Sequence, residues 1–276
     1  MYNIEYDYLE SIFVALLQGI TEFLPISSSG HIVVAQSLLG QDLELGMVFN
    51  IITHAGTLGS IIIYFYKDLR EMVKSAFRML FKPRSVIENW DTDEATRFNI
   101  YVLLSMIPAG VAGFTIRHQL DAAFANPMGV SFMFLFTGTF LFATKFFDQG
   151  RKKLNIKNTF IVGIAQAVSL IPGVSRSGAT ISMAVFLGIN RNDIARFTFI
   201  MMLPVVAGAT LVELLDIGAG SVESAFIPHL ILGFFVSLIS GYFALKYLIV
   251  LFKSKGIHYF AYYCWSIGIF GLIYFS

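Results

Sequence analysis

Six apolar segments of this chain are each long enough to cross a lipid bilayer as a helix. The hydrocarbon core of a bilayer is about 30 Å thick, so a spanning helix needs about 20 apolar residues. The composition agrees, because 56% of the 276 residues are hydrophobic and only 13% are charged, whereas soluble domains are about 25% charged. The sequence therefore predicts an all-α polytopic membrane protein with six transmembrane helices, at Met47–Tyr66, Phe98–Ile116, Met128–Thr144, Phe197–Leu215, His229–Phe252 and Tyr259–Phe275.

Four shorter apolar segments come in two pairs, and each pair is interrupted by a proline followed by serines and glycines. The first pair is Leu9–Leu24 with Ile32–Leu39, and the second is Thr159–Ile171 with Ile181–Ile189. Backbone can be irregular within a membrane only where it is buried in protein or lines a cavity. We therefore predict two re-entrant helix pairs, each of which enters the membrane and returns to the same side.

The distribution of Lys and Arg predicts the orientation. Residues 67–97, 145–157 and 253–255 are basic, whereas the loops 117–127 and 216–228 hold one Lys or Arg between them. By the positive-inside rule the three basic regions are cytoplasmic. The first helix pair then enters from the outside, the second enters from the cytoplasm, and both termini lie outside.

The two pairs also resemble each other in sequence. A shift of 148 residues places Gln18 on Gln166, Ser27 on Ser175, Ser29 on Ser177 and Gly30 on Gly178. Related units that enter from opposite faces form an inverted-topology repeat. We expect one integral membrane domain, with the first repeat at about residues 1–145 and the second at about 157–276. The amphipathic segment Arg70–Lys82 is predicted to lie on the inner membrane surface.

Two polar clusters lie at the predicted breaks, where a membrane protein would otherwise be apolar. If the repeats meet at mid-membrane, the clusters face each other across one cavity. Gln18 and Glu22 are four residues apart and share one face of a helix. The first cluster, QGITEFLPISSSGH, offers Gln18, Glu22, Ser27, Ser28, Ser29 and His31, and the second, PGVSRSGAT, offers Ser175, Arg176, Ser177 and Thr180.

These residue types fit a phosphate or diphosphate anion. Arg176 presents a fork of donors that matches phosphate oxygens, and hydroxyls and free N–H groups at a broken helix add further donors. Glu22 would be repelled by phosphate, so it is interpreted as a ligand for a bridging Mg²⁺ or Ca²⁺, or as a base. His31 is a candidate general acid/base or nucleophile.

Structural interpretations stand beside the functional ones. A structural ion pair would also explain why Glu22 and Arg176 occur in apolar segments. Charged residues within a membrane, however, usually have a function. At least two of the serines and threonines are expected only to cap helix ends. His54 is interpreted as structural, because a single His on an apolar helix usually is.

At the two clusters the chain resembles the undecaprenyl-diphosphate phosphatases, also called bacitracin-resistance proteins. LLQGITEFLPISSSGH and PGVSRSGAT are similar to the two signature motifs of that family, in the same order and about 150 residues apart. The resemblance implies an enzyme of the plasma (inner) membrane that removes the terminal phosphate of undecaprenyl diphosphate. It also implies bacitracin resistance, a site that faces the outer side, and a divalent cation.

The resemblance further implies roles for individual residues. Its essential glutamate, serine and histidine fall on Glu22, Ser28 and His31, and its phosphate-binding arginine on Arg176, with Ser175, Ser177 and Thr180 around it. Two positions depart from the family pattern. Gln18 stands where some members have a second glutamate, and Asn50 stands where related chains often have an acid shortly before His54.

Two other classes of function stay open. A flippase for a polyprenyl phosphate or diphosphate would use the same broken helices and the same arginine, but it would not need Glu22 and His31 as an acid/base and nucleophile. A purely structural membrane subunit leaves Arg176 unexplained.

The sequence also bears on partners. The formal net charge of +1 and the lack of a basic stripe argue against a nucleic-acid partner. A single cysteine, Cys264, excludes an intrachain disulfide and is interpreted as a packed or lipid-facing residue. A homodimer is compatible with the sequence, but no segment indicates an interface.

Overall fold

The computed structural model describes residues 8–39, 46–82, 84, 90–147, 150–217, 226–254 and 256–276. Lys255 and most of the loop 216–228, which entered the orientation prediction, lie outside these residues. The secondary-structure elements of the described residues are helices, joined by turns and short breaks, and one isolated β-bridge pairs Lys152 with Ile189. The helices are α1 (Tyr8–Phe23), α2 (Ser28–Leu39), α3 (Gly46–Tyr64), α4 (Tyr66–Phe81), α6 (Glu94–Thr115), α7 (Arg117–Phe124), α8 (Pro127–Ala143), η1 (Thr144–Phe146), α9 (Ile156–Val168), α10 (Arg176–Phe186), α11 (Arg191–Ile217), α12 (Ile227–Ser254) and α13 (Phe260–Tyr274).

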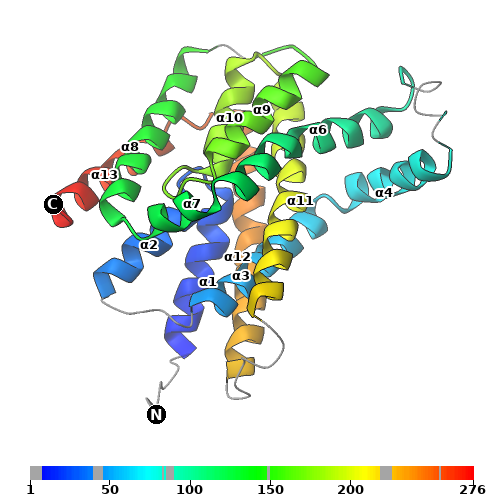
Figure 1. Cartoon of the computed structure of the whole chain (residues 1–276). Helices are drawn as coiled ribbons and strands as arrows, with labels where there is room; N and C mark the ends of the chain where they lie inside the picture. The colour runs from blue at the N-terminus through cyan, green and yellow to red at the C-terminus, as the bar shows by residue number, and fades with distance from the viewer. Residues whose placement is uncertain are drawn as a thin grey trace.

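Each predicted short pair is a pair of helices separated by a short break. The first break lies between α1 and α2 and holds Pro25, and the second lies between α9 and α10 and holds Pro172. In Figure 1, α1 and α2 occupy the lower half of the molecule, whereas α9 and α10 occupy the upper half. The two pairs therefore approach the middle of the molecule from opposite ends, as the inverted-repeat prediction requires.

The predicted spans each coincide with one helix, namely α3, α6, α8, α11, α12 and α13. Among the described residues, α6, α8 extended to Phe146, α11 and α12 are long and apolar enough to cross a membrane. Helix α13 is shorter, and α3 qualifies only together with α4, from which it is bent by 88°. The all-α polytopic class is confirmed, while the number of six spans stays a prediction.

The bend between α3 and α4 separates two different kinds of helix. Helix α3 is apolar, whereas α4 exposes Val73, Phe77 and Leu80 beside the basic residues Lys74 and Arg78. A helix with such a mixed surface suits the boundary between lipid and water. Its position on the inner membrane surface stays a prediction.

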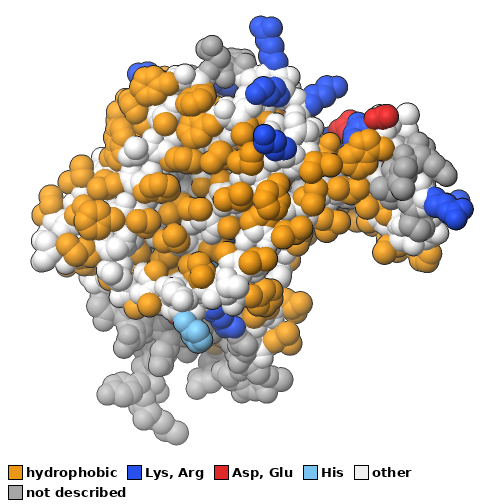
Figure 2. Space-filling model, turned by 45° about the horizontal axis from the view of Figure 1, so that its top comes forward, with side chains coloured by type: hydrophobic (Ala, Val, Ile, Leu, Met, Phe, Trp, Pro, Cys, Tyr) orange, Lys and Arg blue, Asp and Glu red, His pale blue; other side chains and the backbone are white. Residues whose placement is uncertain are grey.

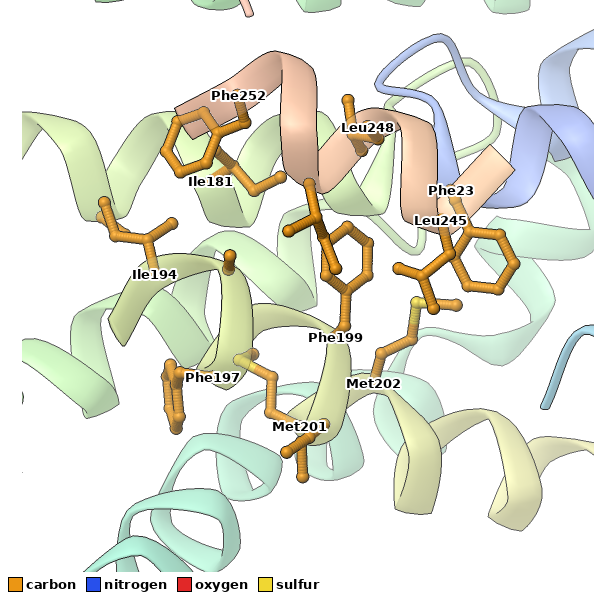
Figure 3. Packing of buried hydrophobic residues seen from close by; sticks show 14 of the residues in the cluster. Phe23, Ile181, Ile194, Phe197, Phe199, Met201, Met202, Leu245, Leu248 and Phe252 are labelled. Carbon is orange, nitrogen blue, oxygen red and sulfur yellow. The ribbon is translucent and has the colours of Figure 1, made fainter. Parts of the chain in front are cut away.

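Helix α11 is at the centre of the hydrophobic core. In the apolar 18-residue window of its candidate span, Arg191–Val212, 56% of the residues are buried, against 33–39% in the corresponding windows of the other candidate spans. Figure 3 shows Phe197, Phe199 and Met202 of α11 among side chains from α12, α10 and α1, such as Leu245, Ile181 and Phe23. The phenylalanines of this core interlock edge to face, with ring centroids of Phe23 and Phe199 6.0 Å apart. This packing supports the end of α1 that carries Glu22.

The outer surface is largely apolar, as expected for a protein in lipid. Figure 2 shows hydrophobic side chains over most of the visible face, with most of the visible Lys and Arg side chains near its upper edge. Small residues allow close approach of the helices inside this surface. A Cβ on Gly19 of α1 or on Gly56 of α3 would collide with the backbone of α12. Close contact of helices at small residues is a general feature of membrane proteins.

Gly173 is required by the backbone at the second break. Its φ is +91°, and a Cβ there would lie 2.5 Å from the carbonyl oxygen of Val130 and 2.6 Å from Cβ of Met133. We expect Gly173→Ala to lower the free energy of unfolding by roughly 2–4 kcal/mol, from backbone strain and overpacking together. The matched control is Gly208→Ala in α11, where no atom lies within 4 Å of the added Cβ. Thermal unfolding in detergent measures both variants, and equal unfolding temperatures would contradict this reason for the glycine.

Candidate active site

The two helix breaks touch each other. The hydroxyl of Ser177, at the start of α10, donates to the carbonyl oxygen of Leu24, at the end of α1, over 3.2 Å. A Cβ on Gly30 would lie 3.0 Å from Cα of Gly173, and a Cβ on Gly178 would lie 3.4 Å from Cβ of Pro25. The expectation that the two clusters meet is therefore correct, although they are 148 residues apart in the chain.

The breaks share one capping hydrogen bond, although the backbone of Ser27 is left-handed and that of Ser175 is extended. Ser27 and Ser175 each accept a hydrogen bond from the backbone N–H three residues later, that of Gly30 at 3.3 Å and that of Gly178 at 3.1 Å. A serine before the first turn is a standard helix cap. The caps occur at positions related by the shift of 148 residues, which supports the repeat in this segment. The boundaries of the whole repeats stay predictions.

In each break the capping serine also lies close to the hydroxyl of the serine two positions later. The Oγ atoms of Ser27 and Ser29 are 3.4 Å apart, and those of Ser175 and Ser177 are 3.3 Å apart. Thr180 donates to the backbone oxygen of Arg176 over 2.8 Å. Ser27 also has a φ of 68°, which is strained for a residue with a side chain. The expectation that at least two of these residues serve as caps is confirmed by Ser27 and Ser175, while substrate binding by the hydroxyls of both breaks stays a prediction.

Glu22 is at the centre of a buried polar network. Its side chain is only 3% exposed. Oε2 accepts hydrogen bonds from Ser28 Oγ at 2.6 Å and from Gln18 Nε2 at 2.9 Å. Arg176 Nη1 lies 3.7 Å from Oε1, and His54 Nε2 lies 3.8 Å from Oε2. Helices α1, α2, α3 and α10 thus contribute to one site.

Ser28 and Arg176 occupy equivalent places in the two breaks. Each is the first residue of its helix, α2 and α10 respectively, and the two positions are related by the same shift of 148 residues. Both side chains reach Glu22. The first break therefore presents a hydroxyl and the second a guanidinium to the same carboxylate.

Arg176 holds donors that the protein leaves unused. Its Nε and Nη1 atoms are buried and have no hydrogen-bond partner, while 24% of the side chain remains exposed. Buried polar groups are almost always hydrogen-bonded, so an unpaired pair of donors calls for an explanation. A phosphate group beside the guanidinium would supply acceptors for such donors, since hydrogen bonds from Arg to phosphate are strong.

His31 belongs to a neighbouring contact set. Its Nδ1–H donates to the carbonyl oxygen of Ser27 over 2.7 Å, and Nε2 lies 2.8 Å from the hydroxyl of Tyr263 in α13. Its ring stacks on Tyr263 with centroids 5.6 Å apart. Both ring nitrogens are thus engaged. Within the described residues, no hydrogen bond or ion pair joins His31 to Glu22 or Arg176.

His54 is the residue whose place the sequence interpretation did not foresee. Nδ1–H donates to the carbonyl oxygen of Asn50 over 2.8 Å, and the other ring nitrogen, Nε2, faces Glu22. Tyr263 was not singled out either. It stands in an apolar segment, and no pattern in the sequence marks it as a partner of His31.

A divalent cation fits the oxygen atoms at Glu22. The described residues contain no group of three or more His, Cys, Asp or Glu that would hold a metal by themselves. Mg²⁺, however, is commonly held by one or two carboxylates together with substrate phosphates. Beside the Glu22 carboxylate, the Oε1 atom of Gln18 is buried without a hydrogen-bond partner. One carboxylate and one unused amide oxygen suit a cation that also binds the substrate.

Fold and site together define a membrane protein in which two broken helix pairs bring a carboxylate, a serine and an arginine into one buried polar cluster. The chain belongs to the bacitracin resistance protein BacA family, whose family model matches residues 11–270. It is accordingly a multi-pass membrane protein.

Relatives match nearly the whole chain. A protein of Methanobrevibacter smithii is 35% identical over 272 residues, covering 95% of this chain and 96% of its own length. A protein of Salinibacter ruber is 37% identical over 264 residues, covering 95% and 97%. One of Bacteroides fragilis is 33% identical over 267 residues, covering 95% and 96%. All three relatives carry the name undecaprenyl-diphosphatase.

Proposed function

We propose that this chain is an undecaprenyl-diphosphate phosphatase, which hydrolyses undecaprenyl diphosphate to undecaprenyl phosphate and inorganic phosphate. It would thereby recycle the lipid carrier of cell-wall synthesis and confer resistance to bacitracin. The observation that carries the proposal is that Nε and Nη1 of Arg176 are buried donors without a partner. Nη1 lies 3.7 Å from Oε1 of the buried Glu22 carboxylate. The names of the relatives support the same reaction.

In the proposed complex, Arg176 binds the diphosphate. Nε and Nη1 would donate to its oxygens, and the N-terminal end of α10 would add a favourable dipole. We propose that Glu22 and Gln18 hold a Mg²⁺ or Ca²⁺ ion. When bound, such an ion neutralises charge on the diphosphate. The positive charges of Arg176 and of the ion would thus reduce the repulsion between the diphosphate and the Glu22 carboxylate.

Ser28 is the proposed nucleophile. Its hydroxyl already donates to Glu22 over 2.6 Å, so Glu22 is placed to take the proton when Oγ attacks the terminal phosphorus. The bond between that phosphorus and the bridging oxygen breaks, and undecaprenyl phosphate leaves. Water then attacks the same phosphorus, the Oγ–phosphorus bond breaks, phosphate is released, and Ser28 regains a proton. His31 is less suited to attack because both of its ring nitrogens are engaged, and we propose that it positions the Ser27–Gly30 turn with Tyr263.

Ser28→Ala tests this role. We expect kcat to fall by about 10²–10³-fold, because both the nucleophile and its hydrogen bond to Glu22 are lost. Acid quenching of wild-type protein during turnover of substrate labelled with ³²P in the terminal phosphate should trap label on the protein, and Ser28→Ala should trap none. Ser37→Ala is the matched control, since Ser37 lies on the same helix and donates only to the carbonyl oxygen of Val33. Wild-type kcat in Ser28→Ala would contradict the assignment and leave direct attack by water.

An assay in detergent micelles distinguishes a flippase from a phosphatase. In detergent micelles there are no two leaflets, so transport makes no product, whereas a phosphatase releases phosphate. Purified wild-type protein is expected to release phosphate from undecaprenyl diphosphate in micelles with Mg²⁺. Folded protein that binds the substrate in micelles without releasing phosphate, and moves it between leaflets in vesicles, would favour the flippase.

We further propose that the protein lies in the plasma (inner) membrane with the site open to the outer side. The positive-inside rule supports this orientation, because one predicted span separates the first helix pair from the basic region 67–97, and three separate it from the basic region 145–157. A homodimer, and the lack of a nucleic-acid partner, stay predictions from the sequence.

A further inference from the structure

A polar cavity lies away from the Glu22 site, where the ends of several helices converge. It has a volume of about 100 Å³, well above the 10–15 Å³ that one water molecule needs. The walls come from η1, the loop before α9, the end of α10, the start of α11 and the loop between α12 and α13. The cavity is lined by Thr144, Lys145, Phe147, Gly150, Val185, Ile189, Arg191, Phe252, Gly256, Ile257 and His258.

The charged and titratable lining residues are all basic. They are Lys145, Arg191 and His258, and Lys152 lies close by, with Nζ 3.8 Å from the place of a Cβ on Gly188. Within the part of the chain that the structure describes, no carboxylate forms an ion pair with Lys145, Arg191 or Lys152. Among the residues that the structure describes, positive charge is thus concentrated around this cavity without an ion pair to a carboxylate.

The geometry holds these groups toward the cavity. Arg191 Nη1 donates to the backbone oxygens of Phe252 and Lys253 at the end of α12, both over 3.1 Å. The other terminal nitrogen, Nη2, lies 3.8 Å from the place of a Cβ on Gly256, and His258 Nδ1 lies 3.5 Å from that place. Gly256 has a φ of +88°, so the turn that carries His258 past Arg191 is one that favours glycine.

The environment of His258 agrees with an unbalanced positive site. Desolvation lowers the pKa of this histidine below its ordinary value, and the nearby charges of Lys145 and Arg191 lower it further. A bound anion would act in the opposite direction on the same group.

We propose that this basic cavity binds a phosphate-bearing anion, through Lys145, Arg191 and His258. Phosphate chemistry fits because Arg and Lys together recognise it, and the apolar wall of Phe147, Ile189 and Ile257 suits a ligand with an apolar part. Two sources carry this chemistry, the headgroup of an anionic phospholipid of the adjacent leaflet and a free phosphate. By the orientation predicted from the basic regions, the cavity is on the cytoplasmic side, opposite the proposed active site.

The test uses full-length protein carrying Arg176→Ala, so that phosphate has no strong ligand at the Glu22 site. Thermal unfolding is followed in detergent with two probes, inorganic phosphate at constant ionic strength, and micelles containing phosphatidylglycerol against micelles containing phosphatidylcholine. A ligand that binds only the folded state raises the unfolding temperature with its concentration. We expect at least one probe to do so. A response to phosphatidylglycerol alone identifies a lipid headgroup, a response to phosphate alone a free anion, and a response to both a general phosphate site.

Two further variants localise the response. Adding Lys145→Gln is expected to weaken the apparent affinity about tenfold, since a charge-assisted hydrogen bond is lost. Lys157→Gln removes the same charge from an exposed position of α9, outside the cavity, and should leave the affinity unchanged. The proposal is overturned if neither probe raises the unfolding temperature, if Lys145→Gln has no effect, or if Lys157→Gln weakens the response as much as Lys145→Gln does.

Discussion

Replacing Arg176 by alanine is expected to lower kcat/KM for undecaprenyl diphosphate by about 10³-fold, the effect of removing a charged donor that stabilises a transferring phosphoryl group. The side chain presents two buried nitrogens with no protein partner and lies at the first turn of α10. Its contact with Glu22, at 3.7 Å, is too long for a hydrogen bond, so the structural ion pair alone does not use these donors. Steady-state phosphate release by purified protein measures the loss.

Two comparisons make this result specific. Arg176→Lys keeps the charge but not the planar fork, so it should recover only part of the activity. Arg151→Ala removes an arginine from an exposed position outside the site and should retain full activity. Unfolding temperatures show whether each variant is folded. If folded Arg176→Ala kept wild-type kcat/KM, Arg176 would be a structural residue and the proposed anion site would be wrong.

Replacing Glu22 by glutamine is expected to lower kcat by about 10²–10³-fold. Glutamine keeps the shape of the side chain and its oxygen can still accept a hydrogen bond from Ser28, but it cannot take a proton and is a weaker ligand for a divalent cation. The variant therefore separates the charge of Glu22 from its packing. Phosphate release measured over a range of Mg²⁺ concentrations should show a lower kcat and a weaker response to the metal.

The matched control for Glu22 is Glu71→Gln. Glu71 lies on α4, is more than half exposed and pairs with Lys74 over 2.7 Å, and such surface pairs contribute little to stability. It should leave both kcat and the Mg²⁺ response unchanged. Unchanged kcat in folded Glu22→Gln would exclude Glu22 as a base and as a metal ligand.

Much of this site could be predicted from the sequence because its polar residues stand in segments that are otherwise apolar. Charged and hydroxyl side chains are costly in apolar segments, so Glu22 and Arg176 stand out without any structure. Prolines and serines beside them predict the helix ends, and Ser27 and Ser175 form the caps. The helical spacing of Gln18 and Glu22 predicts their contact, which the structure has at 2.9 Å.

The rest depends on contacts between distant segments. His54 lies on an apolar helix and has no local signal, and its place beside Glu22 follows from how α3 packs against α1. Tyr263 reaches His31 across 232 positions in the chain. The cavity around Lys145 is made by three separate chain segments, at 144–150, 185–191 and 252–258, and no pattern within any one of them indicates a cavity. Periodicity and spacing describe single elements, so they do not reveal such pairings.

If the two helix breaks form one phosphatase site, Glu22 and Arg176 act together on the same substrate, and a double-variant cycle measures whether they do. Phosphate release from undecaprenyl diphosphate would be measured for wild type, Glu22→Gln, Arg176→Ala and the variant with both changes. Residues that act together in one site have effects that are far from additive. For one shared site, the double variant is predicted to be about as active as the less active of the two single variants. Free-energy losses that simply add, or wild-type activity in either folded single variant, would contradict it.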